Sequence, residues 1–174
     1  MKYREAPFFF ECCGESLLGV LTVPDQPAPV AVVIVVGGPQ YRVGSHRQFL
    51  LLARYLAGHG FACLRFDYRG MGDSGGARVG FEDVGPDIGA ALGALQAELP
   101  NVSQIVIWGL CDGASAASMF AHQDSRVSGL ILFNPWVRTD AIEAETRLKH
   151  YYARRVLHSA FWRKLVSGEV QLGD

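Results

Sequence analysis

Four short apolar runs alternate with segments of helical spacing, and this alternation constrains the fold more than any other feature. The runs are predicted strands, at residues 30–36, 61–66, 104–108 and 127–133. Between them, apolar residues recur three or four positions apart, which is typical of helices that begin at Ser45, near Pro86 and at Gly113. Such an order predicts the α/β class: a parallel-sheet core with right-handed crossovers and helices on both faces.

Local signals set the ends of several predicted elements. In front of the alternation, residues 8–13 and 17–23 are predicted to form an N-terminal β-hairpin joined at Gly14–Ser16. Ser45 and Gln48 match the capping-box pattern, in which two side chains satisfy the first backbone amides of a helix. We therefore expect the first helix to start at Ser45.

The last part of the chain departs from this alternation. Residues 140–167 carry an apolar stripe at helical spacing, with acidic side chains at its start and basic ones at its end. This charge order suits the helix dipole, so the segment is predicted to be a helix with no strand after it. Its basic end and aromatic residues would suit a membrane surface or packing against a core equally well. We therefore do not expect membrane association.

Charge and composition exclude several functions. Hydrophobic residues make up 49% of the 174 residues and charged ones 19%, unlike a disordered or fibrous chain. The net charge of −1, without a basic cluster, argues against nucleic-acid binding. No apolar run reaches the roughly 18 residues of a membrane span or forms a signal peptide. The four cysteines lack CxxC or zinc spacing, so we expect a cytoplasmic protein with reduced thiols and neither metal nor cofactor.

The segment Gly109–Gly113 carries the clearest chemical signal. Its sequence, Gly-Leu-Cys-Asp-Gly, follows a predicted buried strand and precedes a helix of small residues. This is the nucleophile-elbow pattern with cysteine in place of serine, and the flanking glycines Gly109 and Gly113 avoid clashes with neighbouring backbone. Cys111 would stand at a helix N-terminus, which favours its thiolate, and the amide of Asp112 would face a developing oxyanion. The alternative is a buried small residue beside a tight turn.

The loop after the first parallel strand is predicted to supply a second oxyanion donor. In hydrolases with this elbow that loop donates a backbone amide. Gly38 is the candidate, because Pro39 has no N–H to donate. A plain turn at the end of a strand is an equally good reading of this segment alone. After the next strand, Asp67 and Asp73 are expected to accept hydrogen bonds from turn amides.

These motifs together resemble the α/β-hydrolase superfamily. Three segments also resemble the exosortase A system-associated hydrolases of bacterial exopolysaccharide loci: residues 38–46, 108–112 and 133–137. The resemblance covers most of the chain. It implies an enzyme that hydrolyses or transfers an acyl group from an ester or thioester, without naming the substrate.

The resemblance also implies parts that these residues do not supply. The superfamily places its acid and histidine after later strands, and none is predicted beyond residue 133. We therefore expect residues 1–139 to be the N-terminal part of a hydrolase core, residues 140–174 to be a helical lid-like segment, and the chain to be incomplete at its C-terminus. His46 and Gln40, in the predicted oxyanion loop, and Asn134, just past the last strand, are further candidate site residues.

Two functions follow. The first is a hydrolase or acyltransferase with Cys111 as nucleophile, Asp112 and Gly38 as oxyanion donors, and a small acyl compound as substrate. The second is a catalytically incomplete hydrolase fold that acts as a binding or assembly module, since no complete triad can be assembled in the usual order. An open edge at the last strand would also allow two copies to pair as a homodimer.

Overall fold

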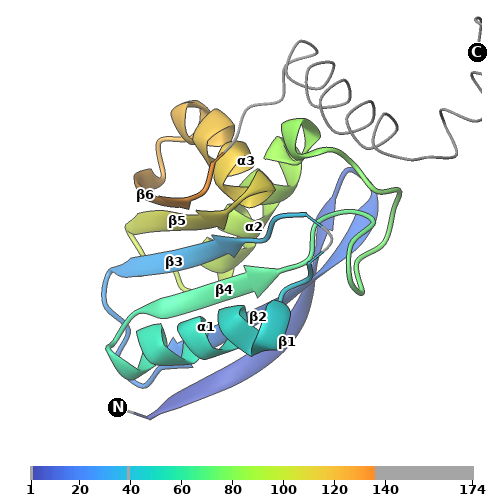
Figure 1. Cartoon of the computed structure of the whole chain (residues 1–174). Helices are drawn as coiled ribbons and strands as arrows, with labels where there is room; N and C mark the ends of the chain where they lie inside the picture. The colour runs from blue at the N-terminus through green and yellow to red at the C-terminus, as the bar shows by residue number, and fades with distance from the viewer. Residues whose placement is uncertain (1, 39, 136–174) are drawn as a thin grey trace, which may run out of the picture. The chain divides into compact units, whose positions relative to one another are not determined.

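The computed structural model describes residues 2–38 and 40–135, which form a six-stranded sheet between helices (Figure 1). The strands are β1 (Tyr3–Cys12), β2 (Glu15–Pro24), β3 (Val30–Val35), β4 (Ala62–Phe66), β5 (Gln104–Leu110) and β6 (Val127–Phe133). The helices are α1 (Gln48–Gly58), α2 (Gly85–Glu98) and α3 (Asp112–Phe120), with short 3₁₀ turns η1 (Ser45–Arg47), η2 (Phe81–Asp83) and η3 (Ala121–Gln123). All four predicted core strands and the three predicted helices between them are present.

The strands lie in the order β1-β2-β4-β3-β5-β6. β3 pairs in parallel with β4 and β5, and β5 pairs in parallel with β6, whereas β2 is antiparallel to β1 and β4. The carboxyl ends of four strands therefore meet at one edge of the sheet, where α/β proteins bind ligands. The predicted α/β class, with a parallel core and an N-terminal hairpin, is confirmed.

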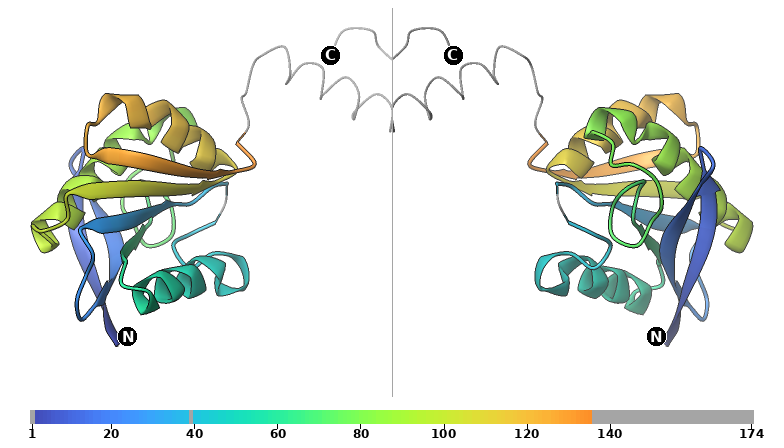
Figure 2. Two further views of the ribbon diagram at one scale, coloured as in Figure 1. Left: turned by 90° about the vertical axis from the view of Figure 1, so that its left-hand side faces the viewer. Right: turned by 90° about the vertical axis from the view of Figure 1, so that its right-hand side faces the viewer.

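Helices cover both faces of the sheet, as Figure 2 shows. α1 lies on one face and buries Phe49, Ala53 and Ala57. α2 and α3 pack together on the other face, and α2 buries an apolar stripe that includes Ile88 and Leu92. With both faces covered, every residue of β4 is buried, which explains why β3 and β4 are apolar throughout except at Arg65 rather than alternating.

Two local predictions need correction. The hairpin strands are longer than predicted and meet at a two-residue turn, Cys13–Gly14, in which both residues have positive φ. The capping box does not form: α1 begins at Gln48 without a side-chain cap. The amides of Arg47 and Gln48, which a Ser45 cap would bind, instead donate to the backbone carbonyls of Gly44 and Ser45.

Some predictions fall on residues that the structure does not describe. The helix over 140–167, the lid-like segment 140–174 and the histidines His150 and His158 lie outside the described residues. Within residues 2–38 and 40–135, none of the helices combines the length and the hydropathy that crossing a membrane requires.

Candidate active site

Cys111 occupies a strained turn between β5 and α3. Its φ of 51° and ψ of −119° are rare for a residue with a side chain. Its backbone N–H donates to the carbonyl of Phe133 at 2.9 Å, and its own carbonyl accepts from the amides of Ala114 and Ser115. The turn is thus fixed to β6 on one side and to α3 on the other. The strand–turn–helix geometry predicted for this segment is observed.

The two glycines that flank Cys111 have no room for a side chain. A Cβ on Gly109 would stand 2.6 Å from the Cα of Ala114. A Cβ on Gly113 would stand less than 3.0 Å from the carbonyl oxygens of Val35 and Val36 in the neighbouring chain segment. Both clashes are with backbone, which cannot rotate away. The elbow pattern therefore requires glycine at these two positions because α3 lies very close to β5 and β3.

Gly37 is a third required glycine, which the sequence analysis missed. A Cβ there would stand less than 3.0 Å from the carbonyl of Leu110 and 3.0 Å from the amide nitrogen of Asp112. The chain leaving β3 therefore lies directly against the elbow, and Gly38 follows with φ +62°. Two consecutive glycines after a buried strand are the signal that could have pointed to this contact.

Asp112 begins α3, so its amide belongs to the first turn of the helix. The amides of a first helical turn carry the positive end of the helix dipole, which favours a negative charge nearby. Cys111 and Asp112 are both half-buried, which leaves the thiol within reach of a small molecule. The structure thus brings Cys111, Asp112 and the Gly37–Gly38 segment together at the carboxyl edge of the sheet.

The segment after β4 packs against the loop after β3. Asp67 is fully buried and accepts hydrogen bonds from the amides of Arg42, at 2.6 Å, and Asp73, at 3.1 Å. This confirms the predicted role of Asp67 in holding turn amides. Tyr68 donates its hydroxyl to the carbonyl of Gly38 at 3.5 Å. Burial, followed by the charge of Asp112, raises the pKa of the Tyr68 hydroxyl, so it remains a donor at neutral pH.

The other three candidates lie near this edge without joining Cys111. His46 is exposed in η1 with φ 48°, and no hydrogen bond joins it to Cys111. Gln40 accepts a hydrogen bond from the side-chain amide of Gln48 at 3.2 Å. Asn134 is exposed, with φ 48°. It follows Phe133, whose carbonyl accepts the hydrogen bond from the Cys111 amide. Across residues 2–38 and 40–135, no three His, Cys, Asp or Glu side chains are arranged to hold a metal.

The remaining cysteines differ from Cys111 in their surroundings. Cys63 lies inside β4, where burial raises the pKa of its thiol to about 12. Burial and the charge of Asp87 raise the pKa of the Cys12 thiol to about 12 as well. At neutral pH both are protonated and are poor nucleophiles. Cys13, at the tip of the hairpin, is exposed and is the natural control for Cys111.

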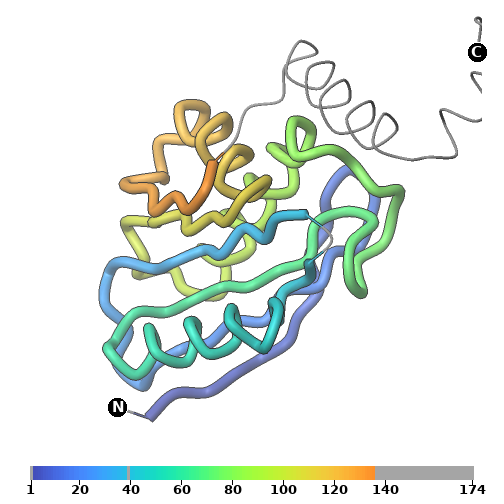
Figure 3. The backbone as a smooth tube through the Cα atoms, viewed as in Figure 1, coloured from blue at the N-terminus to red at the C-terminus, as the bar shows by residue number. Residues whose placement is uncertain are grey.

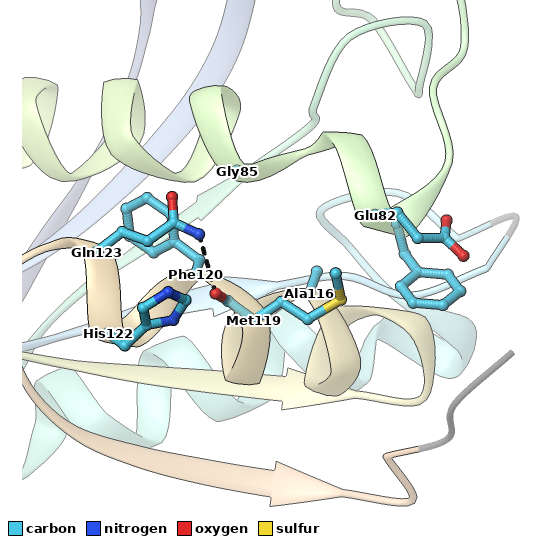
Figure 4. A pocket seen from close by; sticks show the side chains of 8 residues that line it. Glu82, Gly85, Ala116, Met119, Phe120, His122 and Gln123 are labelled. Atoms are coloured by element: carbon cyan, nitrogen blue, oxygen red, sulfur yellow. Dashed lines mark hydrogen bonds between the residues drawn. The ribbon is translucent and has the colours of Figure 1, made fainter.

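A separate pocket of about 240 Å³ lies between the η2–α2 segment and the far half of α3 (Figure 4). Glu82 and His122 stand at its opposite ends, with Met119 and Phe120 between them. His122 is exposed in η3, at the end of α3 remote from Cys111, as predicted. The pocket does not include the elbow, so it lies apart from the candidate site.

Comparisons with known proteins agree with the fold. The model of a family described as serine aminopeptidase, S33, matches residues 27–172. Polyketide transferase GrgF of a Penicillium species is 27% identical over 128 residues, which are 71% of this chain and 42% of that protein.

Two solved structures show the same fold. The crystal structure of the Penicillium α/β-hydrolase GrgF matches with a TM-score of 0.69 at 23% identity, covering 90% of this chain and 54% of that one. The Pyrococcus furiosus esterase Pf2001 matches with a TM-score of 0.73 at 19% identity, covering 87% and 56%. The chain therefore spans about half the length of these relatives.

Proposed function

Since the chain belongs to the serine aminopeptidase S33 family and has the α/β-hydrolase fold, we propose that it carries the nucleophile of an acyl-transfer or hydrolysis site. Cys111 is the nucleophile in this proposal, and an ester or thioester is the substrate class. The observation that carries it is the elbow: a cysteine at φ 51°, at the start of a helix, between two glycines that admit no side chain. Residues held in such strained backbone conformations cluster at active sites.

The proposed acylation step is simple. The thiolate sulfur of Cys111 adds to the carbonyl carbon, and the carbonyl oxygen becomes an oxyanion. The backbone amides of Asp112 and Gly38 stabilise this oxyanion by hydrogen bonding. Collapse breaks the bond to the alcohol or thiol, which leaves as its anion and takes a proton from water. The product is a thioester between the acyl group and Cys111.

Release of the acyl group is the slower step. It requires an acceptor, water or another hydroxyl or thiol, activated by a base. No hydrogen bond joins His46 to Cys111, and His59 and His122, the other described histidines, lie at the carboxyl ends of α1 and α3. We therefore expect the chain to be acylated faster than it is deacylated. GrgF is described as a polyketide transferase and Pf2001 as an esterase, which supports acyl chemistry with either kind of acceptor.

We also propose that the substrate is an acyl compound used beside bacterial exopolysaccharide assembly, in the cytoplasm. The likeness of residues 38–46 and 108–112 to exosortase A system-associated hydrolases supports this proposal. Comparing thioesterase activity on acyl-coenzyme A compounds with esterase activity on acylated sugars would test this. Equal inactivity on both classes would contradict it.

Acylation of Cys111 is the expected result when the chain meets p-nitrophenyl butyrate at neutral pH. Nitrophenolate release should show a burst of one equivalent or less. The mass of the intact chain should rise by one butyryl group, and peptide mapping should find that group on the peptide that holds Cys111. Cys111→Ala should abolish both signals, whereas Cys13→Ser, which removes the exposed thiol, should keep them.

Other outcomes of this experiment are equally informative. A butyryl group on Cys13, or no burst from a chain whose Cys111 still reacts with iodoacetamide, would contradict the proposed enzyme and favour the binding-module alternative. Steady turnover that Cys111→Ala abolishes would reveal a base within the chain. His46→Ala is then the variant to assay next.

The exposed side of β6 supports a second proposal, that two copies pair at this edge. In the described part of the chain β6 pairs only with β5, and Leu130, Ile131 and Phe133 are 38%, 43% and 50% exposed. Open apolar edges of this kind favour pairing with another strand. Sedimentation equilibrium should show a dimer, and Ile131→Lys should shift it to monomer. A wild-type monomer at all concentrations would contradict this pairing.

A further inference from the structure

Arg42 links the loop after β3 to the segment after β4 through both its backbone and its side chain. We name the described residues 36–38 and 40–44 the β3 loop. The Arg42 amide donates to Asp67 at 2.6 Å, and its carbonyl accepts from the Arg65 guanidinium at 3.2 Å. The Arg42 guanidinium pairs with the Asp67 carboxylate and, at 2.6 Å, with Asp73. Four contacts therefore converge on one residue of the loop.

The carboxylate that holds Arg42 is itself immobile. Asp67 has no exposed surface, and a Cβ on Gly72 would overlap its carboxylate oxygens. The Asp67 carbonyl accepts from the hydroxyl of Ser74 at 2.6 Å, and that same hydroxyl oxygen accepts from the amide of Leu18 in β2. Asp67 is thus attached to the sheet on one side and to its own turn on the other. Figure 3 lets the reader follow this part of the backbone beside the β3 loop.

The other end of the β3 loop lies against the elbow. Gly37 approaches Leu110 and Asp112 too closely to admit a side chain, and Tyr68 donates to the carbonyl of Gly38. Gly38 is held at its carbonyl by Tyr68 and lies four positions before Arg42, whose contacts hold the segment that follows. A small shift of an oxyanion donor costs much of its effect, because such donors act through fixed geometry.

We propose that Arg42 is a positioning residue for acylation of Cys111, and that its pairing with Asp67 holds the Gly38 amide in line with the developing oxyanion. This inference rests on the proposed function of Cys111. Arg42 itself touches neither the substrate nor the thiol. Its guanidinium, a planar fork, meets two carboxylates at once, which the single ammonium of lysine cannot reproduce.

Two reactions of the Cys111 thiol distinguish a loss of oxyanion-donor positioning from a general loss of thiol reactivity. Iodoacetamide reacts at a saturated carbon: the sulfur–carbon bond forms as iodide leaves, and no oxyanion arises. p-Nitrophenyl butyrate reacts through an oxyanion, with nitrophenolate as the leaving group. In Arg42→Met the acylation rate of Cys111 should fall about a hundredfold, while its alkylation rate stays within about twofold of wild type. Arg42→Lys should lose less of the acylation rate than Arg42→Met.

Two further variants keep the experiment decisive. Arg126→Met removes another half-buried arginine, paired with Asp124 at 2.5 Å before β6, and should change neither rate. If Arg42→Met does not fold, as judged by near-ultraviolet circular dichroism, Tyr68→Phe removes the hydroxyl on Gly38 and should lower acylation selectively. Unchanged acylation in the folded variants, or an equal fall in both rates, would overturn the positioning role. A wild-type chain that is alkylated but never acylated would overturn the proposed function itself.

Discussion

Replacing Gly113 with alanine is expected to lower the free energy of unfolding by about 4 kcal/mol, at the upper end of what single substitutions do. The added Cβ would stand less than 3.0 Å from the carbonyl oxygens of Val35 and Val36. Val35 is fully buried in β3, which is paired on both sides. Neither backbone can move without breaking sheet hydrogen bonds, so the overlap is not relieved by a rotamer change. Urea denaturation followed by circular dichroism measures the loss.

Gly58→Ala is the matched control for this substitution. Gly58 ends α1, and a Cβ there meets nothing within 4 Å. Alanine has the better helix propensity, so this variant should be as stable as wild type or more stable by up to about 1 kcal/mol. A Gly113→Ala chain within about 1 kcal/mol of wild type would show that the elbow can separate from β3, and the steric reading of the motif would be wrong.

Asp87→Ala is expected to cost about 3 kcal/mol, the lower end of the range for breaking a buried ion pair. Asp87 in α2 has no exposed surface. It accepts hydrogen bonds from the Arg69 amide at 2.8 Å and from the Arg69 guanidinium at 2.8 and 3.1 Å. These hydrogen bonds to Asp87 raise the pKa of Arg69 above its ordinary value. Without Asp87, Arg69 keeps its charge in a site where only 17% of its side chain is exposed.

Arg54→Ala provides the comparison for an exposed ion pair. Arg54 meets Glu5 at 2.6 Å, but 43% of the Arg54 side chain is exposed. Water screens such a pair, and the expected cost is less than about 1 kcal/mol. Both variants can be measured in the same urea series. Equal costs for Asp87→Ala and Arg54→Ala would mean that Arg69 finds solvent as readily as Arg54 does.

The sequence predicted the sheet core well because its signals are local. The run at 30–36 is continuously apolar and the run at 61–66 is interrupted only by Arg65, a composition typical of strands covered on both faces. The elbow was found for the same reason: Gly109 and Gly113 sit two residues on either side of Cys111, and the spacing itself is the signal. Each of these features can be read within a window of about ten residues.

The features that sequence reasoning missed depend on distant partners. Gly37 is required by Leu110, more than seventy positions away, and Arg42 is held by Asp67 across 25 positions. No local periodicity encodes such pairs. The outer ends of β1 were missed because Tyr3 and Arg4 are exposed and lack an apolar pattern, although they pair fully with β2. The capping box did not form because the carbonyls of Gly44 and Ser45 accept from the amides that the Ser45 side chain was expected to bind.

The strand order has a consequence for how the chain reaches its native state. β3 is made before both of its neighbours, because β4 and β5 follow it in the chain. During synthesis β3 stays unpaired until β4 and β5 have been made. The β1–β2 hairpin, in contrast, closes over a two-residue turn and can form within microseconds. Loop closure over long separations slows folding. β3 is therefore paired on both sides only after β5 has been made, and the elbow, which follows β5 directly, reaches β3 at the same stage.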